Sequence, residues 1–452
     1  MINELSATNF KSWKKIEAMR LAPITGLFGT NSSGKTSILQ LLLMLKQTAE
    51  SSDRQQVFEL GDSGTAVQLG SFKDVVFNHA EAEPVTVSLE YLTRQGQVLK
   101  DPNTPGIGIS LESQTKFETC VQKSDSLLSV KSFSYQSGGL NVGMRQLAEK
   151  DKYELVSKSD NFQFERNVGR PWDPPSPTKF YGFPDQVYSY FTNAAFVAGF
   201  QLDLEALLNS ICYLGPLRED PQRIYSWSGG SPSDMGHRGE NAIAALLGSR
   251  EKGAYLTFGS GKPKKTLEEQ VAFWLKELGL IHDFTVKQLH KDSTYYEVKV
   301  RKSENSSEVL LTDVGFGVSQ VLPILVLCYY VPEGSIVILE QPEIHLHPLV
   351  QSGLADVFID AMKTRNIQII LESHSEHLLR RLQRRIAEES LGQEAVALYF
   401  CDTEDGHSVL SELVIDEFGN IKNWPKDFFG DDFAEMAAIT KAAMKRKSEA
   451  SE

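Results

Sequence analysis

A glycine-rich octapeptide near the start of the chain places the tightest limit on its fold. Residues 29–36 are GTNSSGKT, which fits the phosphate-loop pattern GxxxxGK[ST] without a mismatch. In such a loop the backbone N–H groups surround a phosphate, Lys35 places its charge on the β- and γ-phosphates, and the Thr36 hydroxyl ligates Mg²⁺. The pattern requires a strand before the loop and a helix after it. The apolar run before Gly29 and the leucine-rich segment at about 36–48 predict both.

The charge balance argues against non-specific nucleic-acid binding. The chain has 452 residues, enough for two or three domains. Its 46 Lys and Arg residues are outnumbered by 59 Asp and Glu residues, which gives a net charge of −13. An acidic chain is not expected to coat nucleic acid, so its charge does not indicate binding of nucleic acid. A local basic groove is the alternative that the net charge leaves open.

Cysteine usage and hydropathy indicate a cytoplasmic protein. The four cysteines lie far apart without a CxxC pair, which predicts neither a zinc site nor a disulfide framework. The N-terminus lacks the pattern of a signal peptide. The longest apolar run, residues 321–331, is shorter than the ~20 residues that cross a bilayer. We therefore expect no membrane partner.

The chain divides into four predicted segments. Residues 1–80 contain the phosphate loop, and residues 81–204 form a β-rich insertion of short alternating segments between Gly/Pro/Ser-rich turns. Residues 205–395 alternate strands and helices, which predicts a parallel α/β sheet. Within them, Thr266 is the predicted N-cap of a helix, with Glu269 as its capping-box partner and Gly279 as its stop. Residues 396–452 form a small hairpin domain, with its turn at 405–406, and a charged tail.

Three downstream segments carry further nucleotide chemistry. The apolar strand at 336–339 ends in Glu340, as in a Walker B segment, where a carboxylate holds Mg²⁺ directly or through water. A second apolar strand is followed by Ser-His-Ser, and His374 there can reach a γ-phosphate. In the segment LTDVGFGVSQVLPIL, Ser319 and Gln320 open an apolar helix, whose N-terminus is a second phosphate-binding surface.

These motifs, in this order, resemble those of ABC-class ATPases. The wording of NFKSW, NSSGKTS, GFGVSQVLPIL, EQPEIHLHP and SHSEHLL is similar to that of the SMC/RecF/OLD-like branch. More narrowly, it resembles stand-alone bacterial AAA-type ATPases of phage-defence systems, which end in a short domain of unknown function. The resemblance covers about residues 1–80 and 205–430, and no resemblance is identified for the segment between them. It implies an α/β fold, an ABC-type P-loop ATPase head with a mixed or parallel sheet and a β-rich insertion.

The resemblance also implies a site shared between two subunits. In such ATPases two heads bind ATP and Mg²⁺ between them, and the phosphate loop of one faces the signature turn of the other. The implied ATP-binding residues are Gly29, Asn31, Ser33, Gly34, Lys35, Thr36 and Ser37 in the loop, Lys11 and Ser12 before it, and Gly317, Ser319 and Gln320 in the signature turn. The implied metal-binding residues are Thr36 and Glu340. Gln68 is either the Mg²⁺-sensing glutamine of the class or a surface residue.

The chain departs from the family at the implied catalytic base. The residue after the Walker B acid is usually glutamate, and here it is Gln341. An amide can orient water but cannot take a proton from it. Hydrolysis is therefore slow and the ATP-bound dimer long-lived, or Glu343 serves as the base. The implied catalytic set is Glu340, Gln341, Glu343 and His374.

Two patterns allow alternative interpretations. Glu343, His345 and His347 alternate along the chain, so they either ligate a metal or are loop residues of the subunit interface. The arginines at positions 380, 381, 384 and 385 form a helical strip, which either contacts DNA or pairs with acids such as Glu388.

Three functions fit the motifs. The first is a slow ATPase switch in bacterial antiviral defence, a homodimer or higher homo-oligomer that regulates a separately encoded effector such as a nuclease or toxin. The second is a DNA-repair or chromosome-maintenance head acting on DNA ends, although no heptad coiled coil is present. The third is a transporter subunit, although the signature turn departs from the transporter wording LSGGQ.

Overall fold

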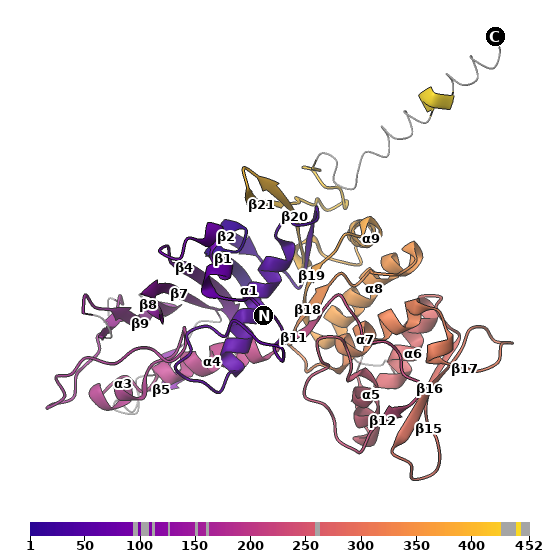
Figure 1. Cartoon of the computed structure of the whole chain (residues 1–452), viewed down its shortest axis with the longest axis horizontal. Coiled ribbons are helices and arrows are strands. Elements are labelled where there is room, and N and C mark those ends of the chain that lie inside the picture. Colours follow the sequence, from indigo (N-terminus) through magenta and orange to yellow (C-terminus); the bar gives the residue numbers. More distant parts are fainter. Residues whose placement is uncertain are drawn as a thin grey trace.

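Two large sheets organise the chain in the computed structural model. The structure describes residues 1–93, 98–100, 108–110, 114–124, 127–149, 152–159, 162–257, 263–425 and 440–443. Figure 1 shows the strands of the antiparallel sheet on one side of β11, β18 and β19, and helices α5 to α8 on the other side.

The central sheet carries the phosphate loop. Its strand order is β11 (Ile211–Leu214), β18 (Ile336–Glu340), β19 (Gln368–Glu372), β3 (Ile24–Gly29), β20 (Val396–Glu404) and β21 (His407–Glu412). All neighbouring strands are parallel except β20 and β21, which form an antiparallel hairpin. A parallel sheet is covered on both faces, so its strands are apolar throughout, as in the IVIL of β18. The predicted α/β head with a mixed sheet is confirmed.

Alternating side chains of this sheet enter two separate cores. Ile336 and Ile338 pack with α1 (Lys35–Glu50) and α4 (Val197–Asn209). Val337 and Leu339 pack instead with the helices of the other face. Those helices are α5 (Ala242–Glu251), α6 (Leu267–Glu277), α7 (Phe316–Tyr330), α8 (Pro348–Arg365) and α9 (Glu376–Ala387). The loop helix α1 and the signature helix α7 therefore lie on opposite faces of one sheet.

The second sheet joins the N-terminus to the predicted insertion. It is antiparallel, and its order is β10 (Tyr153–Ser157), β9 (Leu140–Gln146), β8 (Leu127–Ser137), β7 (Gln114–Ser124), β4 (Val85–Leu92), β1 (Ile2–Phe10) and β2 (Trp13–Arg20). Strand β1 pairs with β2 on one edge and with β4 on the other. The boundary predicted at residues 80 and 81 therefore does not separate two sheets, because β4 satisfies the backbone groups of the free edge of β1.

Smaller elements complete the described chain. They are the strands β12 (Tyr225–Ser226), β15 (Asp283–Gln288), β16 (Tyr295–Arg301) and β17 (Val309–Leu310) in one sheet, the pairs β5 (Val98–Lys100) with β6 (Gly108–Ser110) and β13 (Tyr255–Leu256) with β14 (Lys265–Thr266), the short helices α2 (Phe72–Val75) and α3 (Asp185–Tyr190), and the 3-10 turns Phe77–His79, Leu311–Asp313 and Gln393–Ala395. Among the helices in the described part of the chain, none combines the length and apolar character that crossing a bilayer requires. Most of the charged tail lies outside the described residues.

Helix α6 begins where the sequence predicts. The Thr266 hydroxyl accepts a hydrogen bond from the Glu269 backbone N–H at 3.2 Å. The Glu269 carboxylate in turn accepts one from the Thr266 N–H at 2.7 Å, which completes the capping box. The helix ends at Glu277, and Gly279 follows with a φ of 69°.

Replacement of the cap should destabilise the protein measurably. Thr266→Ala removes the acceptor of the Glu269 N–H and should lower the free energy of unfolding by about 1 kcal/mol. Urea denaturation of Thr266→Ala and of the control Thr266→Ser measures this effect. Equal losses in both variants would contradict the cap role, because serine keeps the hydroxyl.

Candidate functional site

The phosphate loop connects β3 to α1 and depends on two glycines. Gly29 has a φ of 137°, and a Cβ there would lie 2.0 Å from the carbonyl oxygen of Cys401. Gly34 has a φ of 88°, and a Cβ there would lie 2.4 Å from the Ser408 hydroxyl and 2.6 Å from the Ser12 hydroxyl. Both positions therefore exclude side chains by backbone conformation and by contact.

Lys35 is held inside the loop. Its Nζ donates hydrogen bonds to the carbonyl oxygens of Gly29 at 3.1 Å and Thr30 at 2.6 Å, and lies 3.4 Å from the Ser33 hydroxyl. The side chain is buried, and burial lowers its pKa, whereas the charge of Glu372 opposes this shift. Phosphate oxygens carry charge and are stronger acceptors than carbonyl oxygens. The ammonium is therefore placed to exchange loop carbonyls for phosphate.

A cleft of about 600 Å³ lies over the loop. Many of the predicted nucleotide residues line it, and so do several residues that the sequence did not single out. The lining consists of Lys11, Ser12, Asn31, Ser32, Ser33, Gly34, Lys35, Thr36, Ser37, Asp74, Val76, Asn78, His79, Gln341, Glu372 and His374. Chain segments far apart in sequence thus meet around one volume of the size of a ligand pocket.

Besides Gly29 and Gln68, five predicted residues do not line this cleft. Glu340 and Glu343 are buried beside it. Ser319 lines a different pocket together with Pro323, and its hydroxyl donates to the Phe316 carbonyl oxygen at 2.9 Å. The other two residues are Gly317 and Gln320, which lie with Ser319 at the start of α7, because this helix begins at Phe316, before the predicted start. In a single chain, the signature turn and the phosphate loop therefore face different pockets.

Gln68 lies on an exposed loop between the buried residues Val67 and Leu69. It is not among the residues that line the cleft. Its position therefore matches the surface interpretation, in which the neighbouring apolar side chains anchor the loop.

Glu372 is the acid that contacts the loop, and the sequence analysis missed it. The Thr36 hydroxyl donates to Glu372 Oε2 at 2.6 Å. Glu372 ends β19 as Glu340 ends β18, and the two residues are in register. An acid at the end of the second apolar strand, QIILE, was the available signal.

Glu340 has a different environment from Glu372. Burial raises the pKa of Glu340 to about 7, and the charge of Glu372 adds to this, whereas a hydrogen bond with Tyr213 and the charge of Arg218 oppose it. Arg218 is buried, donates to the Glu340 carbonyl oxygen at 3.4 Å, and leaves Nε and Nη1 without partners. Glu340 is therefore directed to a buried polar cluster beside the cleft.

Gln341 and Glu343 follow the Walker B strand in a strained turn. Gln341 has a φ of 43°, and its N–H donates to the Glu372 carbonyl oxygen at 2.9 Å. Glu343 accepts from the His374 N–H at 2.5 Å through Oε1, and its buried Oε2 has no partner. Burial raises the pKa of Glu343, whereas the hydrogen bond from the His374 N–H opposes this shift.

His374 lies exposed in the cleft. Burial of the ring on one side and then the charge of Lys35 lower the pKa of its imidazole. The ring is therefore neutral at neutral pH and has one donor and one acceptor nitrogen for a phosphate or a water.

The donor set of the cleft fits Mg²⁺. Thr36 supplies a hydroxyl, Glu372 a carboxylate and Gln341 an amide oxygen, which are the hard oxygen ligands that this cation prefers. Within the described residues no cluster of three His, Cys, Asp or Glu side chains is arranged to hold a metal ion. Glu343, His345 and His347 therefore do not form such a cluster, and His347 instead caps α8 by accepting from the Leu349 N–H at 3.3 Å.

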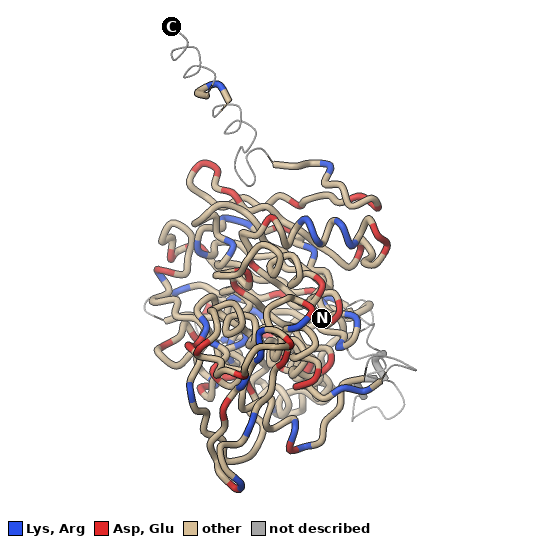
Figure 2. The backbone as a smooth tube through the Cα atoms, turned by 90° about the vertical axis from the view of Figure 1, so that its right-hand side faces the viewer, with Lys and Arg blue, Asp and Glu red and all other residues tan. Residues whose placement is uncertain are grey.

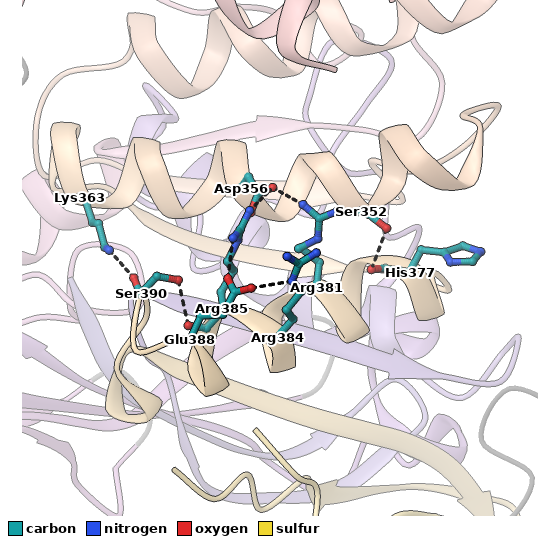
Figure 3. Close-up of polar contacts among 9 residues, drawn as sticks. All are labelled: Ser352, Asp356, Lys363, His377, Arg381, Arg384, Arg385, Glu388 and Ser390. Atoms are coloured by element: carbon teal, nitrogen blue, oxygen red, sulfur yellow. Dashed lines mark hydrogen bonds and ion pairs between the residues drawn. The ribbon is translucent and has the colours of Figure 1, made fainter. Parts of the chain in front are cut away.

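The arginine strip of α9 is paired with acids. Figure 3 shows Arg381 and Arg385 pointing to Asp356 of α8, and Arg384 pointing to Glu388. Arg380 pairs with Glu376 and lies over the ring of Trp424 at 4.5 Å. Figure 2 likewise shows basic and acidic residues interspersed along the chain. The interpretation of the strip as a paired surface is confirmed.

Three family models match the chain. Residues 1–166 match the "AAA ATPase domain", residues 255–380 match the "AAA domain, putative AbiEii toxin, Type IV TA system", and residues 391–439 match the "Protein of unknown function (DUF3696)". The first match extends through β10, so it includes the β-rich segment to residue 166. The sequence analysis identified no resemblance for this part of residues 81–204. No curated protein matches the chain.

Solved structures with a similar arrangement include heads of SMC proteins. One is an SMC head bound to the C-winged helix domain of ScpA, with 11% identity and a TM-score of 0.45, covering 91% of this chain and 98% of that chain. Another is the SMC head of Thermotoga maritima, with 10% identity and a TM-score of 0.42, covering 92% and 99%. A third, from Pyrococcus furiosus, is an SMC head with an extended coiled coil bound to the C-terminal domain of ScpA, with 10% identity and a TM-score of 0.45, covering 91% and 96%. Likeness at this level supports no conclusion about the function of this chain.

The buried position of Glu340 should make stability depend on pH. Its folded-state pKa of about 7 exceeds the unfolded value of 4.5, so the native state keeps a proton that the unfolded state loses between these pH values. Stability therefore falls as pH rises through this window. Glu340→Gln should remove this loss and stabilise the protein above pH ~7 by at most about 3 kcal/mol, at roughly 1.4 kcal/mol per pKa unit.

Urea unfolding of wild type and Glu340→Gln at about pH 5 and about pH 8 tests this expectation. The advantage of the variant should grow toward the higher pH. Glu376→Gln, at an exposed ion pair of α9, is the control and should show no such growth. A constant difference between Glu340→Gln and wild type at both pH values would contradict the shifted pKa.

Proposed function

We propose that this chain, which matches models of AAA-type ATPase domains and of DUF3696, is an ATP-driven switch of the SMC/RecF-like ABC class. It binds ATP with Mg²⁺, assembles with further copies through ATP held between heads, and slowly hydrolyses ATP to ADP and phosphate. Assembly controls a separately encoded effector, such as a nuclease or a toxin, in the bacterial cytoplasm.

The observation that carries this proposal is the separation of the two phosphate-binding elements. The cleft over the loop contains Lys35, Thr36 and His374, and His374 is exposed to solvent. The turn with Ser319 belongs to another pocket of the same chain. Phe316, at the start of α7 beside Ser319, is 68% exposed and is therefore accessible to a second copy. A second copy placed head to tail would bring its turn to the open side of the cleft.

The residues of the cleft have separable tasks in this mechanism. Lys35 exchanges the carbonyl oxygens of Gly29 and Thr30 for phosphate oxygens. Gln341 orients a water molecule for attack but leaves its proton to another group. Glu343 is the proposed acceptor of that proton, because its Oε2 is buried and has no partner. When bound, Mg²⁺ neutralises charge on the phosphates.

Two observations support a role in defence rather than on DNA. The sequence resembles ATPases of phage-defence systems, and the description of one matching family names a putative toxin of a type IV TA system. The arginines of α9, which were the candidate DNA contacts, are occupied by Asp356, Glu376 and Glu388. No described feature specifically favours the DNA-end alternative.

ATP should increase the mass of the particle in solution. Wild type with ATP and Mg²⁺ should shift to a dimer or a higher assembly in light scattering coupled to size exclusion, because ATP connects two heads. Lys35→Ala should not shift, because the cleft loses the cation that meets the phosphates. Lys14→Ala, at an exposed position of β2, is the matched control and should behave as wild type.

A mass that ATP never changes would leave a constitutive assembly, in which ATP alters shape only, or a monomer. A monomer at all ATP concentrations would contradict the role of Ser319 in a second subunit. A constitutive oligomer would contradict ATP-driven assembly but not a shared site.

Removal of the proposed base should slow ATP hydrolysis without weakening ATP binding. Glu343→Gln should lower the rate of ATP hydrolysis by about 10²–10⁴-fold, the usual contribution of general base catalysis. Binding of a fluorescent ATP analogue should stay as in wild type, since Glu343 does not line the cleft. Unchanged turnover would contradict the assignment and leave Gln341 as the only group that acts on the water.

A further inference from the structure

Two acids end neighbouring strands of the central sheet at the same level. Glu340 of β18 and Glu372 of β19 are register partners, so their backbones lie one strand spacing apart. Strand β19 lies between β18 and the loop strand β3, and Glu372 pairs with Leu27 of β3. Because neighbouring strands are ~4.8 Å apart, β18 is roughly 10 Å from β3 and β19 is half as far.

We propose that Glu372, and not Glu340, is the positioning carboxylate for the Mg²⁺ that accompanies ATP. This inference rests on the proposed function, since it needs ATP in the cleft. The sequence pattern assigns the role of the Walker B acid to Glu340 on β18. The inference assigns it instead to Glu372 on the neighbouring strand β19.

Contacts with the phosphate loop carry the assignment. Glu372 accepts a hydrogen bond from the Thr36 hydroxyl at 2.6 Å and lines the cleft. A threonine hydroxyl whose proton is held in this way keeps its oxygen lone pairs for a cation. A carboxylate that fixes such a ligand typically controls metal affinity as strongly as the ligand itself.

The neighbours of the two acids also favour Glu372 over Glu340 as the carboxylate of the cleft. The Lys35 ammonium, which lies inside the phosphate loop, lines the same cleft as Glu372. Glu340 has Tyr213 and Arg218 as its side-chain surroundings and does not line the cleft. Arg218 is itself buried, and its Nη2 donates to the Glu340 carbonyl oxygen at 3.4 Å. Glu340 is thus engaged in the cluster beside the cleft.

A measurement of metal affinity, rather than of hydrolysis, distinguishes the roles of Glu372 and Glu340. The variants are Glu372→Gln and Glu340→Gln, which are matched in chemistry and in register, and Glu376→Gln is the control outside the cleft. Mn²⁺ replaces Mg²⁺ as a paramagnetic cation, and its affinity for each protein with saturating ATP is measured by electron paramagnetic resonance of free Mn²⁺. Binding of fluorescent mant-ATP in EDTA shows in parallel whether each variant keeps its folded cleft.

The expected result is a loss of Mn²⁺ affinity in Glu372→Gln by about 10–100-fold. Glu340→Gln should lose clearly less, and mant-ATP binding in EDTA should be kept by all variants. Wild-type Mn²⁺ affinity in Glu372→Gln, or an equal or larger loss in Glu340→Gln, would overturn the inference alone. A wild type that binds mant-ATP neither in EDTA nor with Mn²⁺ would overturn the proposed function together with it.

Discussion

The position of β19 between β3 and β18 is the constraint on which the nucleotide cleft depends. Because the three strands are parallel, their carboxyl ends meet at one edge of the sheet, where the loop after β3 begins. Strand β19 therefore delivers Glu372 and His374 directly to the loop. It also holds Gln341 in place, since the Glu372 carbonyl oxygen accepts the Gln341 N–H.

The same sheet separates the two phosphate-binding elements. Its strands are apolar on both faces and divide their side chains between two cores. The phosphate-loop helix α1 packs in one core and the signature helix α7 in the other. Burial thus fixes the two helix N-termini on different faces of one sheet, and the proposed site that uses both requires a second copy of the chain.

Buried charges are concentrated around this edge of the sheet. Burial raises the pKa values of Glu340, Glu343 and Glu372 and lowers those of Lys35 and Arg218. Each of these groups costs free energy to bury and is retained where phosphate and a cation would meet it. Charges on α9, in contrast, are paired with acids of α8 and α9 and with Glu388.

The sequence alone determined those features that depend on local rules. The phosphate loop, the Thr266 cap and the hairpin turn at 405–406 each need only a few neighbouring residues, because glycine conformations and capping hydrogen bonds are short-range. Only the tertiary structure decided that Glu372 contacts Thr36, that Gln68 is exposed, and that β4 continues the sheet of β1. Strand order and edge pairing join residues more than 70 positions apart, as in the hydrogen bond between Thr8 and Thr86, and no periodicity within a segment encodes which strand becomes its neighbour.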